Sequence, residues 1–215
     1  MALLILLKWG ARVIFDHLVV GGTTLLAAQA HVEEALGVPM QTGGAHEVFQ
    51  THNMLMGLED GLYLEAIAPN PDVAPPTRPR WYDLDRFTGP PRLSNWACAV
   101  DDMEAALTNM PPDTGQPVEV RRGDLQWRMA VSRDGTTPFD NLWPALIEWP
   151  RTAVHPSSRL SCTNVRLRRF TLVHPDGLAL ATTLRQFLAD DRIAIETGAY
   201  ALHAEFETPH GIRTL

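Results

Sequence analysis

The stretch FDHLVV, residues 15–20, is the first part of this 215-residue chain with the clear pattern of a β-strand. It is apolar except for Asp16 and His17. Because side chains alternate across a strand, a regular strand places His17 on the same face as Phe15 and Val19. If that face closes onto a core, His17 is a satisfied buried histidine. If the face lines a cleft, His17 is a candidate ligand or base.

The residues that follow FDHLVV predict a β-α-β-β-β unit. Residues 23–38 carry apolar side chains at helical spacing and end near Gly37, which suits a helix C-terminus. Residues 52–58 and 62–68 flank the turn EDG and predict a hairpin. A short extra strand around Val48 completes the unit.

The same order of elements returns in the second half of the chain. The pattern predicts a strand, a helix and three further strands over residues 93–100, 101–110, 117–122, 125–132 and 142–150. A weak internal repeat of this kind predicts two copies of one unit, paired so that each buries the apolar face of the other.

These patterns divide the chain into four segments of one compact α+β domain. The expected segments are a first βαβββ module, a proline-rich linker, a second module and a C-terminal extension, over residues 1–69, 70–92, 93–150 and 151–215. The extension has the pattern β-α-β-β and is interpreted as a third, incomplete unit that completes or extends one sheet.

Composition narrows the class of protein. A net charge of −7 argues against general nucleic-acid binding, which needs a basic surface. Two cysteines are too few for a disulfide framework, so we expect a reducing, cytoplasmic compartment. The start, MALLILLKWGARV, is too short to span a bilayer and is a poor signal peptide. An additional strand and an upstream-assigned start codon are equal alternatives for residues 1–14.

Two glutamates are placed among apolar neighbours. Glu65 shares its predicted strand face with Tyr63 and Ile67, and Glu148 lies in the apolar run of residues 142–150. A buried carboxylate without a partner is costly, so a divalent cation or an arginine is expected beside each.

The duplicated βαβββ unit, beginning with DH and ending in YLE, resembles the vicinal oxygen chelate superfamily. More narrowly, the chain is similar to the glyoxalase-like domain family through FDHLVV, THNMLMGLEDGLYLEAIAP (residues 51–69) and PALIEW (residues 144–149). The resemblance implies a cupped mixed sheet built from the paired modules. It also implies a cleft that holds a divalent metal ion.

The resemblance assigns roles to residues on the first and last strands of each module. It implies metal ligands at His17, Glu65 and Glu148, with Glu65 or Glu148 as catalytic base when not bound to metal. Asn95 takes the remaining position and departs from the pattern, because an amide oxygen competes poorly with water for a transition metal. The nitrogen and carboxylate donors would suit Zn, Mn, Fe or Ni.

Further residues are expected to contact substrate. The predicted substrate-binding set comprises His52, Asn53, Asn95, Arg128 and Trp143. His52 is also a reserve ligand, and Arg128 would bind a carboxylate or enolate oxygen if its strand face lines the cleft. Trp127 and Trp149 are then expected on the opposite face, packed against helices, and His46 in a solvated loop.

Two functions from different classes fit these expectations. The first is a metal-dependent lyase, isomerase or dioxygenase acting on a small organic substrate with vicinal oxygens. The alternative is a metal-free protein that sequesters an apolar or aromatic small molecule, as resistance proteins of the superfamily do, and Asn95 favours it. A mainly structural protein whose tail mediates a homodimer is a third. All three exclude nucleic-acid and membrane partners.

Overall fold

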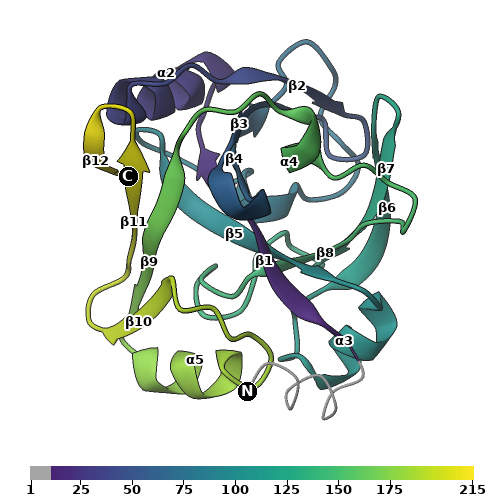
Figure 1. Ribbon diagram of the computed structural model, residues 1–215. Coiled ribbons are helices and arrows are strands. Elements are labelled where there is room, and N and C mark those ends of the chain that lie inside the picture. Colours follow the sequence, from purple (N-terminus) through teal and green to yellow (C-terminus); the bar gives the residue numbers. More distant parts are fainter. Residues whose placement is uncertain (1–10) are drawn as a thin grey trace.

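The computed structural model describes residues 11–215 and shows a curled sheet with helices and a second, smaller sheet outside it (Figure 1). The alternatives for the beginning of the chain fall largely on residues 1–10, which lie outside the described residues. Within residues 11–215, no helix is long and apolar enough to cross a membrane.

The first module has the predicted order of elements. They are β1 (Val13–Gly21), α2 (Leu25–Leu36), β2 (Gln41–His46), β3 (Thr51–Gly57) and β4 (Tyr63–Pro69), with a short 3-10 turn, η1 (Glu59–Gly61), between the last two. The extra strand expected around Val48 is β2 instead, because residues 47–50 form the turn into β3 and Gln50 has a left-handed φ of 50°.

The second module repeats the order and joins the first in one sheet. Its elements are β5 (Arg92–Val100), α3 (Met103–Asn109), β6 (Gln116–Arg122), β7 (Leu125–Val131) and β8 (Ala145–Glu148). The eight strands are ordered β2-β3-β4-β1-β5-β8-β7-β6, with β1 and β5 antiparallel at the centre. Each module pairs its first and last strands in parallel. The predicted α+β fold of paired modules is thereby confirmed.

The sheet curls until its two end strands meet. The Arg122 side chain of β6 lies against the backbone of Gly44 in β2, where an added Cβ would stand 2.9 Å from it. The curl gives the sheet an inner face, which carries Val19, Ile67 and Trp127, and an outer face covered by helices and the extension. The inner face encloses the space in which the cleft was expected.

The C-terminal extension packs on the outer face of the central strands (Figure 1). Its elements are α4 (Pro156–Arg159), β9 (Arg166–His174), α5 (Gly177–Leu184), β10 (Ile193–Thr197), β11 (Ala201–Thr208) and β12 (Gly211–Thr214). The expectation that the extension completes or extends one sheet is corrected, because its strands form a separate second sheet of order β10-β9-β11-β12. Strand β12 is beyond those expected. Phe170 of β9 contacts Trp96 of β5 with ring centroids 5.4 Å apart, so aromatic packing attaches the extension.

The proline-rich segment does more than connect the modules. It contains the 3-10 turn η2 (Trp81–Asp83), and Trp81, Tyr82 and Leu84 are buried on the inner face of the sheet. The expected linker is therefore also part of the wall of the cleft.

A β-bulge in β1 changes which side chains share a face. The register with β5 shifts between Phe15 and His17, so Asp16 is an extra residue in the ladder. Phe15 consequently packs in the outer core with Trp96, whereas His17 faces inward. The expectation that Phe15 and His17 share a face is corrected by this bulge.

The N-terminus of α2 offers a small test of these local rules. The Thr24 hydroxyl accepts a hydrogen bond from the backbone N–H of Ala27 at 3.2 Å. Thr24→Ala should lower the free energy of unfolding by about 1 kcal/mol, because the N–H of Ala27 loses its acceptor. Urea denaturation measures this, with Thr23→Ala as the matched control. Equal losses for the two variants would contradict the assigned cap.

Candidate active site

The bulge residue Asp16 is a buried carboxylate that accepts three hydrogen bonds from side chains. Its Oδ1 accepts from His17 Nδ1 at 2.6 Å, and its Oδ2 accepts from His155 Nε2 and Trp149 Nε1, both at 3.0 Å. Burial alone raises the pKa of Asp16, but the hydrogen bonds and charges of His155 and His17 outweigh it and hold the pKa well below its usual range. Asp16 is therefore a fixed negative charge.

Asp16 also sets the tautomer of His17. An ionised carboxylate only accepts, so His17 Nδ1 carries the proton and Nε2 is left as the basic nitrogen. This Nε2 lies 3.2 Å from the Tyr82 hydroxyl and 3.7 Å from Glu65 Oε2. Tyr63 stacks on the imidazole with ring centroids 4.4 Å apart. His17 is thus a buried histidine whose Nε2 faces the polar side chains of Tyr82 and Glu65.

Glu65 is held in place by Asn53. The Asn53 amide nitrogen donates to Glu65 Oε1, and the Asn53 Oδ1 accepts from the backbone N–H of Gly44 at 2.9 Å. The same amide nitrogen lies 3.4 Å from His46 Nε2, and His46 Nδ1 lies 3.0 Å from the Thr51 hydroxyl. The second oxygen of Glu65 is left directed toward His17.

His46 is buried in this cluster as a neutral group. Burial first of all, and then the positive charge of Arg122, lower the pKa of His46 well below its ordinary value. Its two nitrogens fit this state, since Nδ1–H donates to Thr51 and Nε2 accepts from Asn53. The expectation that His46 lies in a solvated loop is corrected, because it ends β2 and faces inward.

The neutral state of His46 predicts how stability depends on pH. The unfolded chain binds a proton at this side chain below a pH of about 6.5, whereas the folded chain does not. The free energy of unfolding is therefore unaffected by His46 above that pH, and it decreases as the pH falls further, because protonation of His46 favours the unfolded chain. His46→Gln should remove a slope of up to about 1.4 kcal/mol per pH unit between pH 6 and 5, measured by urea denaturation. An unchanged slope would contradict a neutral His46.

Trp81 and Tyr82 fill most of the space in front of this cluster. Trp81 stacks on Phe49 with ring centroids 4.2 Å apart, and Tyr82 places its hydroxyl on His17. Burial, and then the charges of Glu65 and Asp16, raise the pKa of Tyr82, so its O–H remains a donor to His17 Nε2. The remaining cavity is about 10 Å³, close to the least that one water molecule needs.

Four of the residues predicted for the site are brought to the inner face. His17, Glu65 and Asn53 form one hydrogen-bonded group, as described above. Asn95 lies beside Val19 in the register of β5 with β1. With its amide nitrogen turned toward acceptors, Asn95 donates to the backbone carbonyl of Tyr82 at 3.3 Å. Asn53 and Asn95 therefore position Glu65 and Tyr82.

Glu148 and Arg128 lie on the outer face instead. Arg128 forms ion pairs with Glu148 and with Glu104 of α3, and Glu148 accepts from the backbone N–H of Met103 at 3.2 Å. Glu148 thus has the arginine partner that was expected for a carboxylate among apolar neighbours, but it does not approach His17.

Trp127 of β7 and Trp149, which directly follows β8, were expected on the outer face of the sheet and lie on the inner face. Trp127 and Trp149 pack on the inner face, opposite Arg128 and Glu148. The alternation of side chains was predicted, but the face that turns inward was not. The structure corrects this placement. Indole rings fill the inner face, whereas on the outer face Arg128 forms an ion pair with Glu104 of α3.

His52 and Trp143 are also away from the cluster. His52 lies on the outer face of β3, on the side of Met54 and Met56. Trp143 is fully buried in the outer core, where its ring meets Phe187 at 6.0 Å. Both residues were expected at the cleft. The structure corrects this expectation, because His52 lies on the outer face and Trp143 in the outer core.

Several residues of the cluster were missed by the sequence analysis. They are Asp16, His46, Tyr82, Arg122, Trp149 and His155. The dipeptide DH and the aromatic pair WY inside a proline-rich segment were the available signals. His155 was expected to mark a turn before Pro156, and it does cap α4, but it also closes the Asp16 site.

The side chains present do not fit a transition-metal ion held by the protein. His17 Nε2 and Glu65 Oε2 supply two donors from the first module, but β8 turns Ile147 inward and β5 supplies only the Asn95 amide. Residues 11–215 contain no group of three His, Cys, Asp or Glu side chains placed to hold a metal. Protein zinc sites ordinarily use three or four such donors.

Two βαβββ modules that enclose a polar cluster define the class of this protein as the vicinal oxygen chelate fold. The model of the glyoxalase-like domain family matches residues 15–188, and the chain belongs to that family. No protein with a curated description matches the chain.

Comparison with solved structures finds similar chains. A hypothetical protein from Staphylococcus aureus is 12% identical, with a TM-score of 0.60 and coverage of 87% of both chains. A methylmalonyl-CoA epimerase from Mycobacterium tuberculosis is 18% identical, with a TM-score of 0.42 over 63% of this chain and 87% of that one. A variant 4-hydroxymandelate synthase from Streptomyces coelicolor is 17% identical, with a TM-score of 0.42 over 69% and 51%.

Proposed function

We propose that the protein catalyses proton transfer on a small organic substrate, with His17 as the base. The observation that carries the proposal is the Asp16–His17 pair, in which a buried carboxylate bonds to Nδ1 and leaves Nε2 facing the side chains of Tyr82 and Glu65. A carboxylate bound to Nδ1–H also stabilises the imidazolium that forms when Nε2 accepts a proton.

Glu65 supplies the second group that such a reaction needs. Its Oε2 lies 3.7 Å from His17 Nε2, so a substrate atom placed beside this pair can contact both a base and a carboxylate. A proton removed by His17 from a carbon beside a carbonyl group can be returned to another atom of the same substrate. Isomerase and lyase reactions on a substrate with adjacent oxygens follow this pattern.

The reaction proposed here does not require a metal bound by protein side chains. The expected Zn, Mn, Fe or Ni ion would find His17 and Glu65, but residues 11–215 place no third ionisable donor beside them. The metal-dependent version of the function therefore has less support than acid–base catalysis by the side chains alone.

Deuterium exchange in heavy water tests this function without a known substrate. The protein is incubated with 2-oxo acids, hydroxyketones and acyl thioesters, with and without a chelator, and carbon-bound deuterium is measured by mass spectrometry. We expect enzyme-dependent exchange in one class of compound, undiminished by the chelator. Exchange that needs an added divalent cation would contradict the proposal.

The aromatic lining of the cavity favours one other function, which is sequestration of a small molecule. Trp81, Trp127 and Trp149 surround the cavity together with Tyr63 and Tyr82. Such rings bind planar apolar molecules by stacking. Tight binding of a compound that undergoes no exchange, unaffected by His17→Asn, would support this second function over the first.

A further inference from the structure

Arg122 is a cation on the inner face that forms no ion pair with the residues that the structure describes. It lies at the end of β6, beside the cavity, with its guanidinium 5.9 Å from the centre of the Trp127 ring. Within residues 11–215 no carboxylate lies within ion-pair distance of it, and the nearby Asp124 is bound through both oxygens to Arg159. A half-buried guanidinium in this position can bind an anionic ligand.

A second observation at the same place also points to an acceptor ligand. The indole Nε1 of Trp127 is buried beside the cavity and has no hydrogen-bond partner among the described residues. A buried donor without an acceptor is unfavourable. Trp127 and Arg122 lie on neighbouring strands, β7 and β6, and both face inward. On this side of the cavity, the Arg122 guanidinium and the Trp127 N–H therefore both lack an acceptor among the described residues.

We propose that Arg122 and Trp127 form a carboxylate-binding subsite, so that the ligand of this cavity is a small organic acid with an apolar body. The proposal rests on the proposed function, which it deepens by naming the chemical class of the substrate. The carboxylate oxygens accept from the Arg122 guanidinium and the Trp127 N–H. The apolar body contacts Met129 and Ile147, which also line the cavity.

The ligand must displace the side chain of Tyr82. The present cavity of about 10 Å³ is too small for a carboxylate with an apolar body. Tyr82 and Asp83 have left-handed φ values of 57° and 56°, which are unfavourable for residues with a Cβ. A backbone change in this turn that withdraws Tyr82 would relieve this strain, open the space and free His17 Nε2.

Matched ligands and matched variants test the subsite. Calorimetric titration compares benzoate with benzamide, which has nearly the same shape and no charge. Both are measured with the wild type and with Tyr82→Ala, in which the cavity is already open. We expect benzoate to bind at least tenfold more tightly than benzamide in one or both proteins. Arg122→Gln should abolish that preference.

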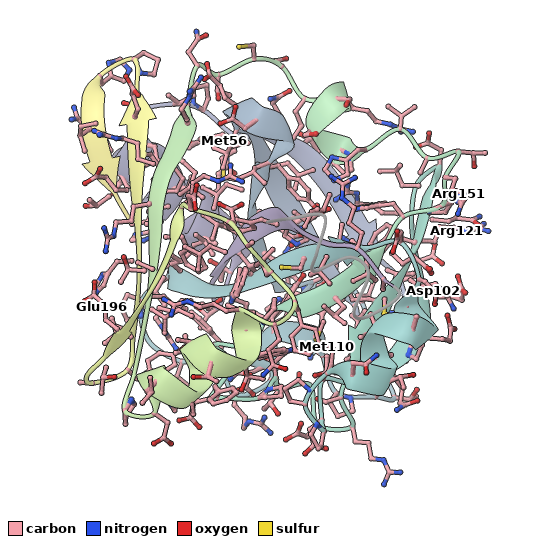
Figure 2. The ribbon with its side chains drawn as sticks, turned by 60° about the horizontal axis from the view of Figure 1, so that its bottom comes forward. Met56, Asp102, Met110, Arg121, Arg151 and Glu196 are labelled. Atoms are coloured by element: carbon pink, nitrogen blue, oxygen red, sulfur yellow. The ribbon has the colours of Figure 1, made fainter. Side chains whose placement is uncertain are left out.

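Arg121→Gln is the matched control for charge. Arg121 is exposed and lies at the periphery of the molecule (Figure 2), on the opposite face of β6 from Arg122. This variant should keep the preference for benzoate. A preference that persists in Arg122→Gln, or is absent in both the wild type and Tyr82→Ala, overturns the subsite.

His17→Asn separates failure of the subsite from failure of the proposed function. The subsite alone predicts that this variant still prefers benzoate. If wild-type protein prefers benzoate and catalyses no exchange with any organic acid, the subsite stands and proton transfer does not. If exchange occurs only with uncharged compounds, proton transfer stands and the subsite does not.

Discussion

His17→Asn should lower the rate of substrate deuterium exchange by about 10²–10⁴-fold, the usual contribution of a positioned acid–base group. Asparagine can donate from its amide nitrogen to Asp16, as His17 Nδ1 does, so the buried carboxylate keeps a partner. The variant lacks a basic nitrogen at the place of Nε2. The loss should therefore come from chemistry while the fold is retained, which circular dichroism and thermal unfolding would verify.

His52→Asn is the control for this substitution. His52 is a histidine of the same module on the outer face of the sheet, so its replacement should leave the exchange rate within about twofold, since general-base catalysis requires contact with the substrate. A wild-type rate in His17→Asn, or equal losses in the two variants, would remove His17 from the reaction.

Asp16→Ala should lower the free energy of unfolding by about 3–5 kcal/mol, measured by urea denaturation. The substitution removes the acceptor of three donors, His17 Nδ1, His155 Nε2 and Trp149 Nε1, two of which are on partly buried side chains. Breaking a buried charged network by removing one partner costs this much because the remaining polar groups stay buried without acceptors.

Asp140→Ala is the matched control for stability. Asp140 also bonds to a buried histidine, His174, at 3.1 Å, but its own side chain is 81% exposed. Water can replace an exposed carboxylate, so we expect a loss within about 1 kcal/mol. A similar small loss for Asp16→Ala would show that its three hydrogen bonds do not stabilise the fold.

The order of the elements could be predicted from the sequence because local signals mark their ends. Thr24 and Gly37 delimit α2, and both modules repeat the same succession of strands and helix. The position of β2 was missed, because the residues of the actual strand, QTGGAH, have little strand-like alternation. Only its pairing with β3 identifies it as a strand.

The inward and outward faces were harder to predict. Alternation along β7 separates Trp127 from Arg128 but does not say which side chain faces the cleft. The choice depends on long-range contacts, since Arg128 finds Glu104 and Glu148 outside. In β1 the bulge at Asp16 breaks the alternation, and only the pairing with β5 reveals it.

His17 and Glu65 were predicted because both lie in strand patterns of the first module that resemble the glyoxalase-like domain family. The rest of the cluster comes from places that a pattern of strands does not connect. Tyr82 enters from a proline-rich segment, and His155 reaches Asp16 across 139 positions of the chain. Such contacts form because the sheet curls, and the sequence around each residue does not predict them.

The tautomer of His17 tests the central claim most directly. Long-range ¹H–¹⁵N correlation spectra, with the His17 signals assigned by their absence in His17→Asn, distinguish a protonated from an unprotonated ring nitrogen. When the imidazole is neutral, the proton should be on Nδ1, bound to Asp16, and Nε2 should be bare. A neutral His17 with its proton on Nε2 would contradict a base that Asp16 orients toward Glu65.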